Sequence, residues 1–141
     1  MEKQNNAIKV FSMENDEFFK IFLRDTLVVY SSRQVLITSA ETAEDALSIL
    51  IGALPEVPNI IFLCLSIPTR PGEKTDLLGG FKVLENLRKA EGFEKVPIVI
   101  FSKYDDKKLQ KKAKLLGATK YLVKGECMPK DLADVVEISG K

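Results

Sequence analysis

The sequence predicts an α/β fold in which five parallel strands carry helices on both faces of one sheet. Two observations lead to this fold class. Apolar runs and amphipathic stretches alternate five times along the 141 residues, as they do where strands feed crossover helices. Three of the runs are almost wholly apolar, which is typical of strands covered on both faces. A chain of this length forms one core, so we predict a single domain over residues 1–141, with its first seven residues flexible.

Each predicted strand is a short run of apolar and β-branched residues. In chain order the runs are Ile8–Met13, Val35–Thr38, Asn59–Cys64, Val96–Phe101 and Lys120–Val123. Five such strands, each followed by a helical pattern, fit the flavodoxin-like doubly wound fold.

The helices between the strands are predicted from apolar residues that recur three and four positions apart. Their buried stripes are expected to be Phe18, Phe19, Phe22, Leu23 and Leu27, then Ala46, Leu47, Leu50, Ile51 and Leu54, then Phe81, Leu84 and Leu87, and then Leu109, Ala113 and Leu116. Thr42 and Asp105 are the expected N-caps of the second and fourth helices, and Gly117 follows the fourth. A fifth helix with a weak pattern is expected around residues 130–138.

Residues 68–80 (PTRPGEKTDLLGG) interrupt this alternation. Two prolines and three glycines predict an extended surface loop. The loop follows the third strand at its carboxyl end, which is the edge where open parallel sheets place their ligands.

Composition excludes several classes of function. The chain has no histidine, which excludes an imidazole base and histidine-liganded zinc. Its 21 basic and 20 acidic residues leave a net charge of +1, too small for a general attraction to nucleic acid or a membrane. Two cysteines, Cys64 and Cys127, are too few for a disulfide framework. The sequence has no signal-peptide pattern and no spanning stretch, so we predict a cytoplasmic protein without membrane association.

Five segments of the chain, in their order and spacing, resemble the receiver domain of two-component response regulators. They are IKVFSMENDEFF at the first strand, PNIIFLCLSIP at the third, GGFKVLENLRK at the third helix, VPIVIFSKYDD at the fourth strand and LGATKYLVKG at the last. The resemblance covers residues 8–138. It implies the receiver form of the flavodoxin-like fold and a role in phosphorelay signalling rather than an enzyme activity.

Receivers accept a phosphoryl group on an aspartate at the end of the third strand, and the resemblance places Cys64 at that position. A thiol supplies neither the carboxylate of an acyl phosphate nor a hard oxygen ligand for magnesium. The family's acid pair falls on Glu14 and Asn15, with Asp16 beside them. Because Asn15 is neutral where the family has an anion, we expect no catalytic residue, no resident metal or other cofactor, and weak Mg²⁺ binding at best.

Three further positions keep the residue types that the family uses. Ser102 falls where a Thr or Ser contacts the phosphoryl group, Lys124 where a lysine reaches the same group, and Tyr121 at the aromatic switch position. Gly125 replaces the proline that usually follows the lysine. Structural interpretations of these residues are a helix cap for Ser102, an edge-strand aromatic for Tyr121 and an ion pair between Lys124 and Glu14.

A lysine-rich segment is the one charge asymmetry of the chain. Residues 103–124 hold eight lysines and two aspartates, a local balance of 8 − 2 = +6. In receivers the fourth helix and last strand bind partners, so the resemblance implies a protein partner there, such as a histidine kinase, with Lys108, Lys111 and Lys112 on the docking face. The segment has no arginine and few aromatics, which weighs against nucleic acid. A homodimer is compatible with the sequence, and a solvated helix face is the alternative.

The function predicted from the sequence is that of a receiver-like domain which lacks the phosphoacceptor aspartate and acts as a phosphorylation-independent interaction module. Two alternatives remain, namely a receiver that is phosphorylated on another acid and a thiol-based redox sensor that acts through Cys64. Lys124 favours a thiolate at Cys64, whereas Glu14 opposes it. The simpler interpretation of Cys64 is an inert side chain that fills the acid pocket.

Overall fold

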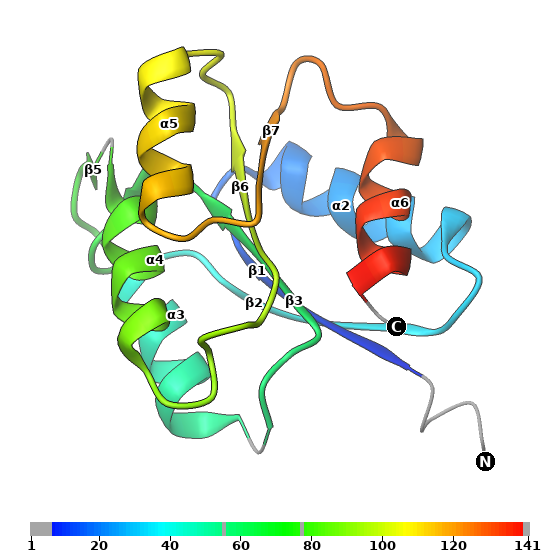
Figure 1. Ribbon diagram of the computed structural model, residues 1–141, viewed down its shortest axis with the longest axis horizontal. Coiled ribbons are helices and arrows are strands. Elements are labelled where there is room, and N and C mark those ends of the chain that lie inside the picture. The colour runs from blue at the N-terminus through cyan, green and yellow to red at the C-terminus, as the bar shows by residue number, and fades with distance from the viewer. Residues whose placement is uncertain (1–6, 55, 77, 140–141) are drawn as a thin grey trace.

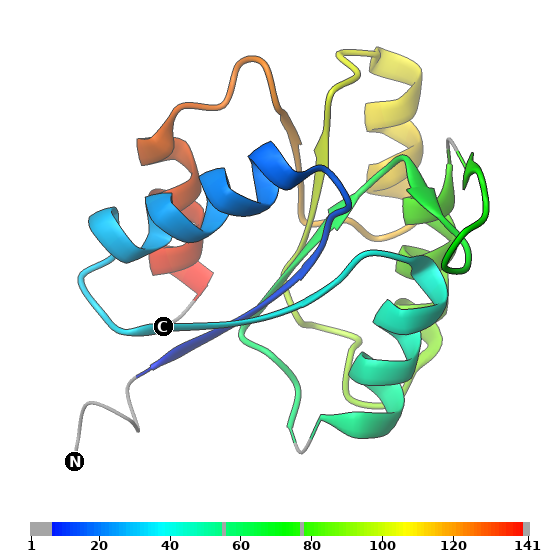
Figure 2. The ribbon, with the colours of Figure 1, turned by 180° about the vertical axis from the view of Figure 1, so that it is seen from behind.

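The computed structural model describes residues 7–54, 56–76 and 78–139. Its central sheet contains five parallel strands in the order β2-β1-β3-β6-β7. They are β1 (Ile8–Met13), β2 (Val35–Ala40), β3 (Ile60–Cys64), β6 (Ile98–Ser102) and β7 (Lys120–Val123). Figures 1 and 2 show helices on both faces of the sheet, so the predicted doubly wound fold is confirmed.

The helices form one layer on each face of the sheet. Helices α2 (Glu17–Tyr30) and α6 (Pro129–Ser139) lie side by side on one face (Figure 1). The other face carries α3 (Ala43–Leu47), α4 (Gly79–Lys89) and α5 (Lys107–Leu115). Helix α3 continues directly into a π-helical segment, η1 (Ser48–Ala53). This division separates the core into two apolar layers.

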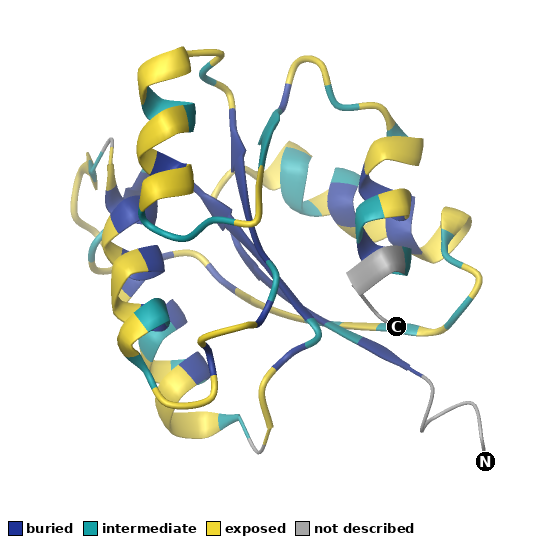
Figure 3. Ribbon diagram, in the orientation of Figure 1, coloured by how far each residue is buried: buried dark blue, intermediate teal, exposed yellow. Residues whose placement is uncertain are grey.

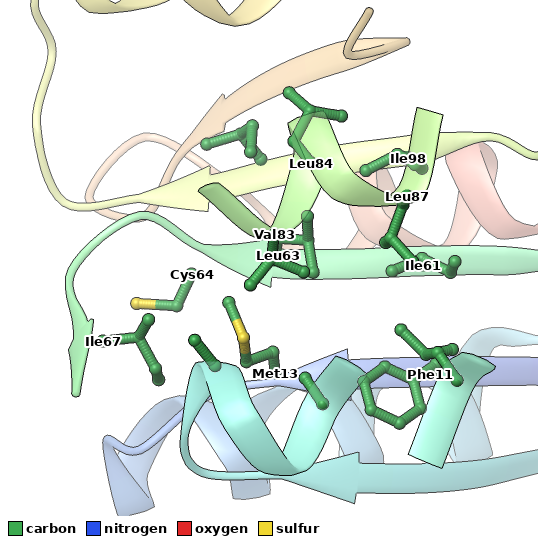
Figure 4. Packing of buried hydrophobic residues seen from close by; sticks show 14 of the residues in the cluster. Phe11, Met13, Ile61, Leu63, Cys64, Ile67, Val83, Leu84, Leu87 and Ile98 are labelled. Carbon is green, nitrogen blue, oxygen red and sulfur yellow. The ribbon is translucent and has the colours of Figure 1, made fainter. Parts of the chain in front are cut away.

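The burial of each strand follows its place in the sheet. Every residue of β3 and β6 is buried because these strands are covered by helices on both faces. The edge strands β2 and β7 are partly exposed (Figure 3). Cys64 belongs to the apolar layer beneath α3 and α4, where it lies at the end near Met13 and Ile67 (Figure 4). The end of β3 therefore meets both the core and the carboxyl edge of the sheet.

Two of the predicted helix stripes contain a residue that the structure exposes. Phe18 is 65% exposed, because it lies about 140° around the helix from Leu23 and about 180° from Leu27, which are buried. Ile51 is 54% exposed within η1. The other stripe positions are buried or half-buried. The pattern thus locates both helices correctly but makes each buried face one residue too wide.

The caps agree with the sequence in all but one case. The Thr42 hydroxyl accepts a hydrogen bond from the Asp45 amide at 3.1 Å, as predicted. Gly117 follows α5 with a φ of 106°, the left-handed conformation expected there. The N-cap of α5 is Asp106 rather than Asp105, because its carboxylate accepts from the Lys108 amide at 2.8 Å.

In the segment 68–80, residues 69–74 lie outside any strand or helix, and residues 68, 75–76 and 79–80 belong to regular elements. The segment contributes to a short antiparallel hairpin of β4 (Ile67–Pro68) and β5 (Thr75–Asp76), and its last two residues begin α4. An ion pair from Arg70 Nε to a Glu44 carboxylate oxygen, at 3.0 Å, ties the hairpin to α3. A second ion pair, at 2.6 Å between Lys82 Nζ and Asp76, ties it to α4. The first of these contacts is long-range and the second is local, and together they hold a segment that its composition predicts to be a loop.

The ends of the chain bear on two further predictions. Residues 1–6 of the expected flexible N-terminus lie outside the described residues. Ala7, the last residue of that prediction, is buried, with 7% of its surface exposed. Among the described helices, none is both long and apolar enough to cross a membrane.

Candidate functional site

A pocket of about 240 Å³ lies at the carboxyl edge of the sheet. The ends of four strands meet there, which is where open α/β sheets bind ligands. Its lining residues come from all four strand ends and from the hairpin, and they are Glu14, Asn15, Asp16, Cys64, Ser66, Thr75, Ser102, Lys103 and Lys124. The structure thus brings six of the seven predicted pocket and switch positions together, and Tyr121 is the one that does not line the pocket.

Lys124 is held inside the pocket by a charge and by aromatic rings. Its Nζ lies 2.8 Å from Glu14 Oε1, and both side chains are buried. The same nitrogen lies 4.5 Å from the ring centroid of Phe19 and 5.6 Å from that of Phe101. Aromatic faces attract a cation most strongly when water is excluded, so the two rings stabilise the buried ammonium. Lys124 therefore pairs with Glu14, as the structural interpretation of the sequence has it.

Glu14 uses both of its carboxylate oxygens. Oε1 takes the ion pair with Lys124, and Oε2 accepts a hydrogen bond from the Asp16 amide at 3.2 Å. Glu14 follows β1 directly, and its own amide donates to the Ala40 carbonyl at the end of β2. The carboxylate is thereby fixed at one place on the edge of the sheet.

The Cys64 thiol is kept protonated by its surroundings. Burial, and next the negative charge of Glu14, raise the pKa of Cys64 from 9.0 to about 11, although Lys124 acts in the opposite direction. The thiol donates to the Ser66 carbonyl at 3.2 Å, and its sulfur accepts from Lys124 Nζ at 3.7 Å. A protonated, buried thiol is a poor nucleophile.

The donor set of the pocket does not fit a resident Mg²⁺ ion. Mg²⁺ is usually held by one or two free carboxylates. Here Glu14 already has a counter-ion, and the Asp16 carboxylate caps α2 by accepting from the Phe18 amide at 2.9 Å. Asn15 is neutral, and Cys64 offers sulfur instead of oxygen. Over the ranges that the structure describes, no three acidic or cysteine side chains gather as metal ligands.

Ser102 and Tyr121 belong to a hydrogen-bonded chain that leads away from the pocket. Ser102 Oγ accepts from the Tyr104 amide at 3.0 Å, and the Tyr121 hydroxyl donates to the Tyr104 carbonyl at 2.8 Å. Ser102 is buried and Tyr121 is half-buried. Burial raises the pKa of the Tyr121 phenol. Ser102 therefore braces the loop before α5 and is not the cap of that helix, since Asp106 has this role.

The basic face is smaller than the sequence suggests. Seven of the eight lysines between residues 103 and 124 are exposed, and the eighth, Lys124, is buried against Glu14. With Asp105 and Asp106 both exposed, the exposed balance is 7 − 2 = +5. Lys112 also packs against α4, because its Nζ lies 5.2 Å from the ring centroid of Phe81. Lys108 and Lys111 remain as freely exposed positions of the predicted docking face.

Five residues at this site escape the sequence analysis: Ser66, Thr75 and Lys103 line the pocket, and Phe19 and Phe101 flank the Lys124 ammonium. The sequence places Phe19 in a helix stripe and Phe101 in a strand, and nothing in the apolar pattern indicates that their rings face an ammonium group. Thr75 belongs to the hairpin strand β5 and Ser66 lies between β3 and β4, and both line the pocket. Their one sequence signal is the position of the unusual segment directly after the third strand.

Comparison with known proteins gives a match in structure alone. No family model matches the sequence, and no curated protein matches it. The structure of chemotaxis protein CheY4 of Vibrio cholerae is 19% identical with a TM-score of 0.73, covering 94% of this chain and 98% of that one. The phosphorylated cyanobacterial phytochrome response regulator RcpA is 17% identical with a TM-score of 0.71, covering 95% and 89%.

A metal-bound structure is among the similar ones. The Mn²⁺-bound form of response regulator Rcp1 is 18% identical with a TM-score of 0.72, covering 92% of this chain and 89% of that one. These identities are low, so the similarity speaks for the fold and not for the chemistry of the pocket. The chain has the fold of a response-regulator receiver domain, as the segments of its sequence predict.

Proposed function

We propose that this chain is a signal-transduction domain of the two-component type that accepts no phosphoryl group and acts by binding another protein. The observation that carries the proposal is the buried pair of Lys124 and Glu14 beside the protonated thiol of Cys64. Phosphoryl transfer requires a nucleophile and positive charge directed at the transferred group. Here the nucleophile position is a thiol, and the nearby ammonium is committed to a carboxylate.

Phosphorylation on another acid of the pocket is less well supported. Glu14 has both oxygens engaged, and Asp16 caps α2. Attack on a phosphodonor by either carboxylate first breaks these contacts. The redox alternative is weakened by the pKa of about 11 at Cys64, because the reactive species is the thiolate. Binding to another protein, without phosphorylation or thiol oxidation, is therefore the best supported function. The proposal includes neither an enzyme activity nor a cofactor.

The proposed partner is a protein that docks on α5 and β7. Lys108 and Lys111 are two of the exposed lysines that make this face positive, and Tyr121 lies in β7 next to α5. A histidine kinase or another signalling protein with an acidic surface fits such a face. Both cysteines are free, which agrees with the reducing cytoplasm where the proposal places the protein.

Intact-mass spectrometry after incubation with a small acyl phosphate and Mg²⁺ tests the proposal. We expect no gain of a phosphoryl group, because the thiol is protonated and the pocket cation is already paired. A receiver that is readily phosphorylated serves as the positive control for the donor. An acid-labile adduct on this chain, lost in Glu14→Gln or Asp16→Asn, would establish the alternative of phosphorylation on another acid.

A further inference from the structure

The ammonium group of Lys124 contacts a carboxylate, a sulfur atom and an aromatic ring. Glu14 Oε1 lies at 2.8 Å, Cys64 Sγ at 3.7 Å and the Phe19 ring centroid at 4.5 Å. Lys124 is 8% exposed and Glu14 is 3% exposed. A buried ammonium is stable only with a counter-charge, and a buried carboxylate likewise. The two groups therefore depend on one another.

The pair spans the edge of the sheet. Glu14 follows β1 and Lys124 follows β7, and β3 and β6 lie between these strands. The Lys124 side chain consequently reaches back across the end of β3, where its nitrogen contacts the Cys64 sulfur. The lysine amide donates to the Ser102 carbonyl at 2.7 Å, which fixes the start of this reach at the end of β6. The positive charge that pairs with Glu14 thus comes from a residue whose backbone lies beyond two intervening strands, directly after β7.

We propose that the Lys124 ammonium is the built-in cation of this pocket and takes the place beside Glu14 that a divalent ion would need. This inference rests on the proposed function, since it explains how the pocket keeps one state without metal or phosphoryl group. Lys124 is a positioning residue here, since it acts through Glu14 and touches no substrate. Removal of its charge leaves Glu14 as a buried anion without a counter-charge, beside Asn15 and Asp16. Such a site binds a cation from solution more tightly than the wild-type pocket does.

Thermal unfolding with and without Mg²⁺, at matched ionic strength, tests this substitution of one cation for another. We expect Mg²⁺ to leave the Tm of the wild type unchanged. Lys124→Met should unfold at a lower temperature, and Mg²⁺ should recover several degrees of that loss by binding the folded state. In the double variant Glu14→Gln with Lys124→Met, Mg²⁺ should again have no effect, because the anion is gone. Matched ionic strength separates binding from general screening.

Lys103→Met is the matched control, since Lys103 lines the same pocket but lies outside the ion pair with Glu14. It should keep the wild-type indifference to Mg²⁺. If Lys124→Met does not fold, Lys124→Gln and refolding of both variants in Mg²⁺ replace the melting experiment. The proposal is wrong if Mg²⁺ stabilises the wild type as much as the variant, or if Mg²⁺ fails to stabilise or refold either variant. The phosphodonor experiment has a separate readout, so it can fail while this one succeeds.

Discussion

Cys64 lies between an apolar layer and a charged pair, and this position determines its acidity. Burial and Glu14 raise the pKa of the thiol to about 11, so it is protonated throughout the neutral range. A thiol whose pKa is higher in the folded than in the unfolded state stabilises the fold below the unfolded value. This contribution is complete below pH 9.0 and is lost as the pH rises toward about 11.

Alkylation kinetics check this conclusion at the residue scale. In a Cys127→Ser background, Cys64 should react very slowly with iodoacetamide at neutral pH and faster only as the pH approaches 11, because the thiolate is the nucleophile. The background is needed because burial also raises the pKa of Cys127 to about 11. Cys64→Ser in the same background supplies the blank. Rapid alkylation at pH 7, or a peroxide-dependent change in partner binding that Cys64→Ser abolishes, would favour the redox sensor.

The residues of the pocket differ in how far the sequence could predict them. Cys64 ends a strand, and Glu14 and Lys124 each follow one directly, so their meeting at one edge follows from the parallel sheet. The cation–π contacts of Phe19 and Phe101 with Lys124 could not be predicted, because an apolar pattern indicates that a ring is buried and not which group the ring faces. That information depends on side-chain packing between α2, β6 and β7.

At the scale of elements, α4 begins in close contact with the end of β3. The Gly80 amide donates to the Leu65 carbonyl at 2.8 Å. A Cβ atom on Gly80 would lie 2.8 Å from Leu65 Cα and closer still to the Cys64 carbonyl oxygen. Both neighbours are backbone atoms, so they cannot move aside as a flexible side chain could. The glycine is therefore a packing requirement of the junction that supports the pocket.

Gly80→Ala tests this contact. We expect a loss of about 1–3 kcal/mol in the free energy of unfolding, the usual cost of overpacking a close contact. Gly52→Ala is the matched control, because a Cβ atom there meets nothing within 4 Å. The control should be neutral or stabilising, by up to roughly 1 kcal/mol, since alanine loses less entropy than glycine on entering a helix. Chemical denaturation measures both, and equal effects in the two variants would refute the packing explanation.

The hairpin marks the limit of prediction at this scale. Its strands have two residues each, too few to show a period of two. It is held by ion pairs from Arg70 to Glu44 and from Lys82 to Asp76. The first of these joins residues 26 positions apart in the sequence. The composition of residues 68–80 cannot indicate a partner as distant in the sequence as Glu44, so it predicts an extended loop.

For the molecule as a whole, the lysine-rich surface belongs to one helix and not to a whole face of the sheet. Lysines are concentrated on α5 and near β7, whereas the other helices carry acidic side chains as well, among them Glu44 on α3 and Glu85 on α4. The periodic pattern predicted the strands and helices, because burial on two faces and on one face leaves different signatures. The periodic pattern does not separate Lys124 from the exposed lysines, and the ion pair with Glu14 was expected only from the resemblance to receivers.

Charge reversal on α5 tests whether this face binds the partner. Lys108→Glu with Lys111→Glu should leave the fold intact, since both side chains are exposed and, unlike Lys112, neither lies over Phe81. Association with the partner that the wild type captures should slow severalfold at low salt and depend less on salt, because peripheral charges act mainly on encounter. Arg24→Glu with Lys130→Glu, which changes the net charge equally on the opposite face, should have a much smaller effect. Stopped-flow kinetics across a range of NaCl concentrations measure the association rates of both double variants. Equal slowing in the two would show that only net charge matters and that α5 is a solvated helix surface.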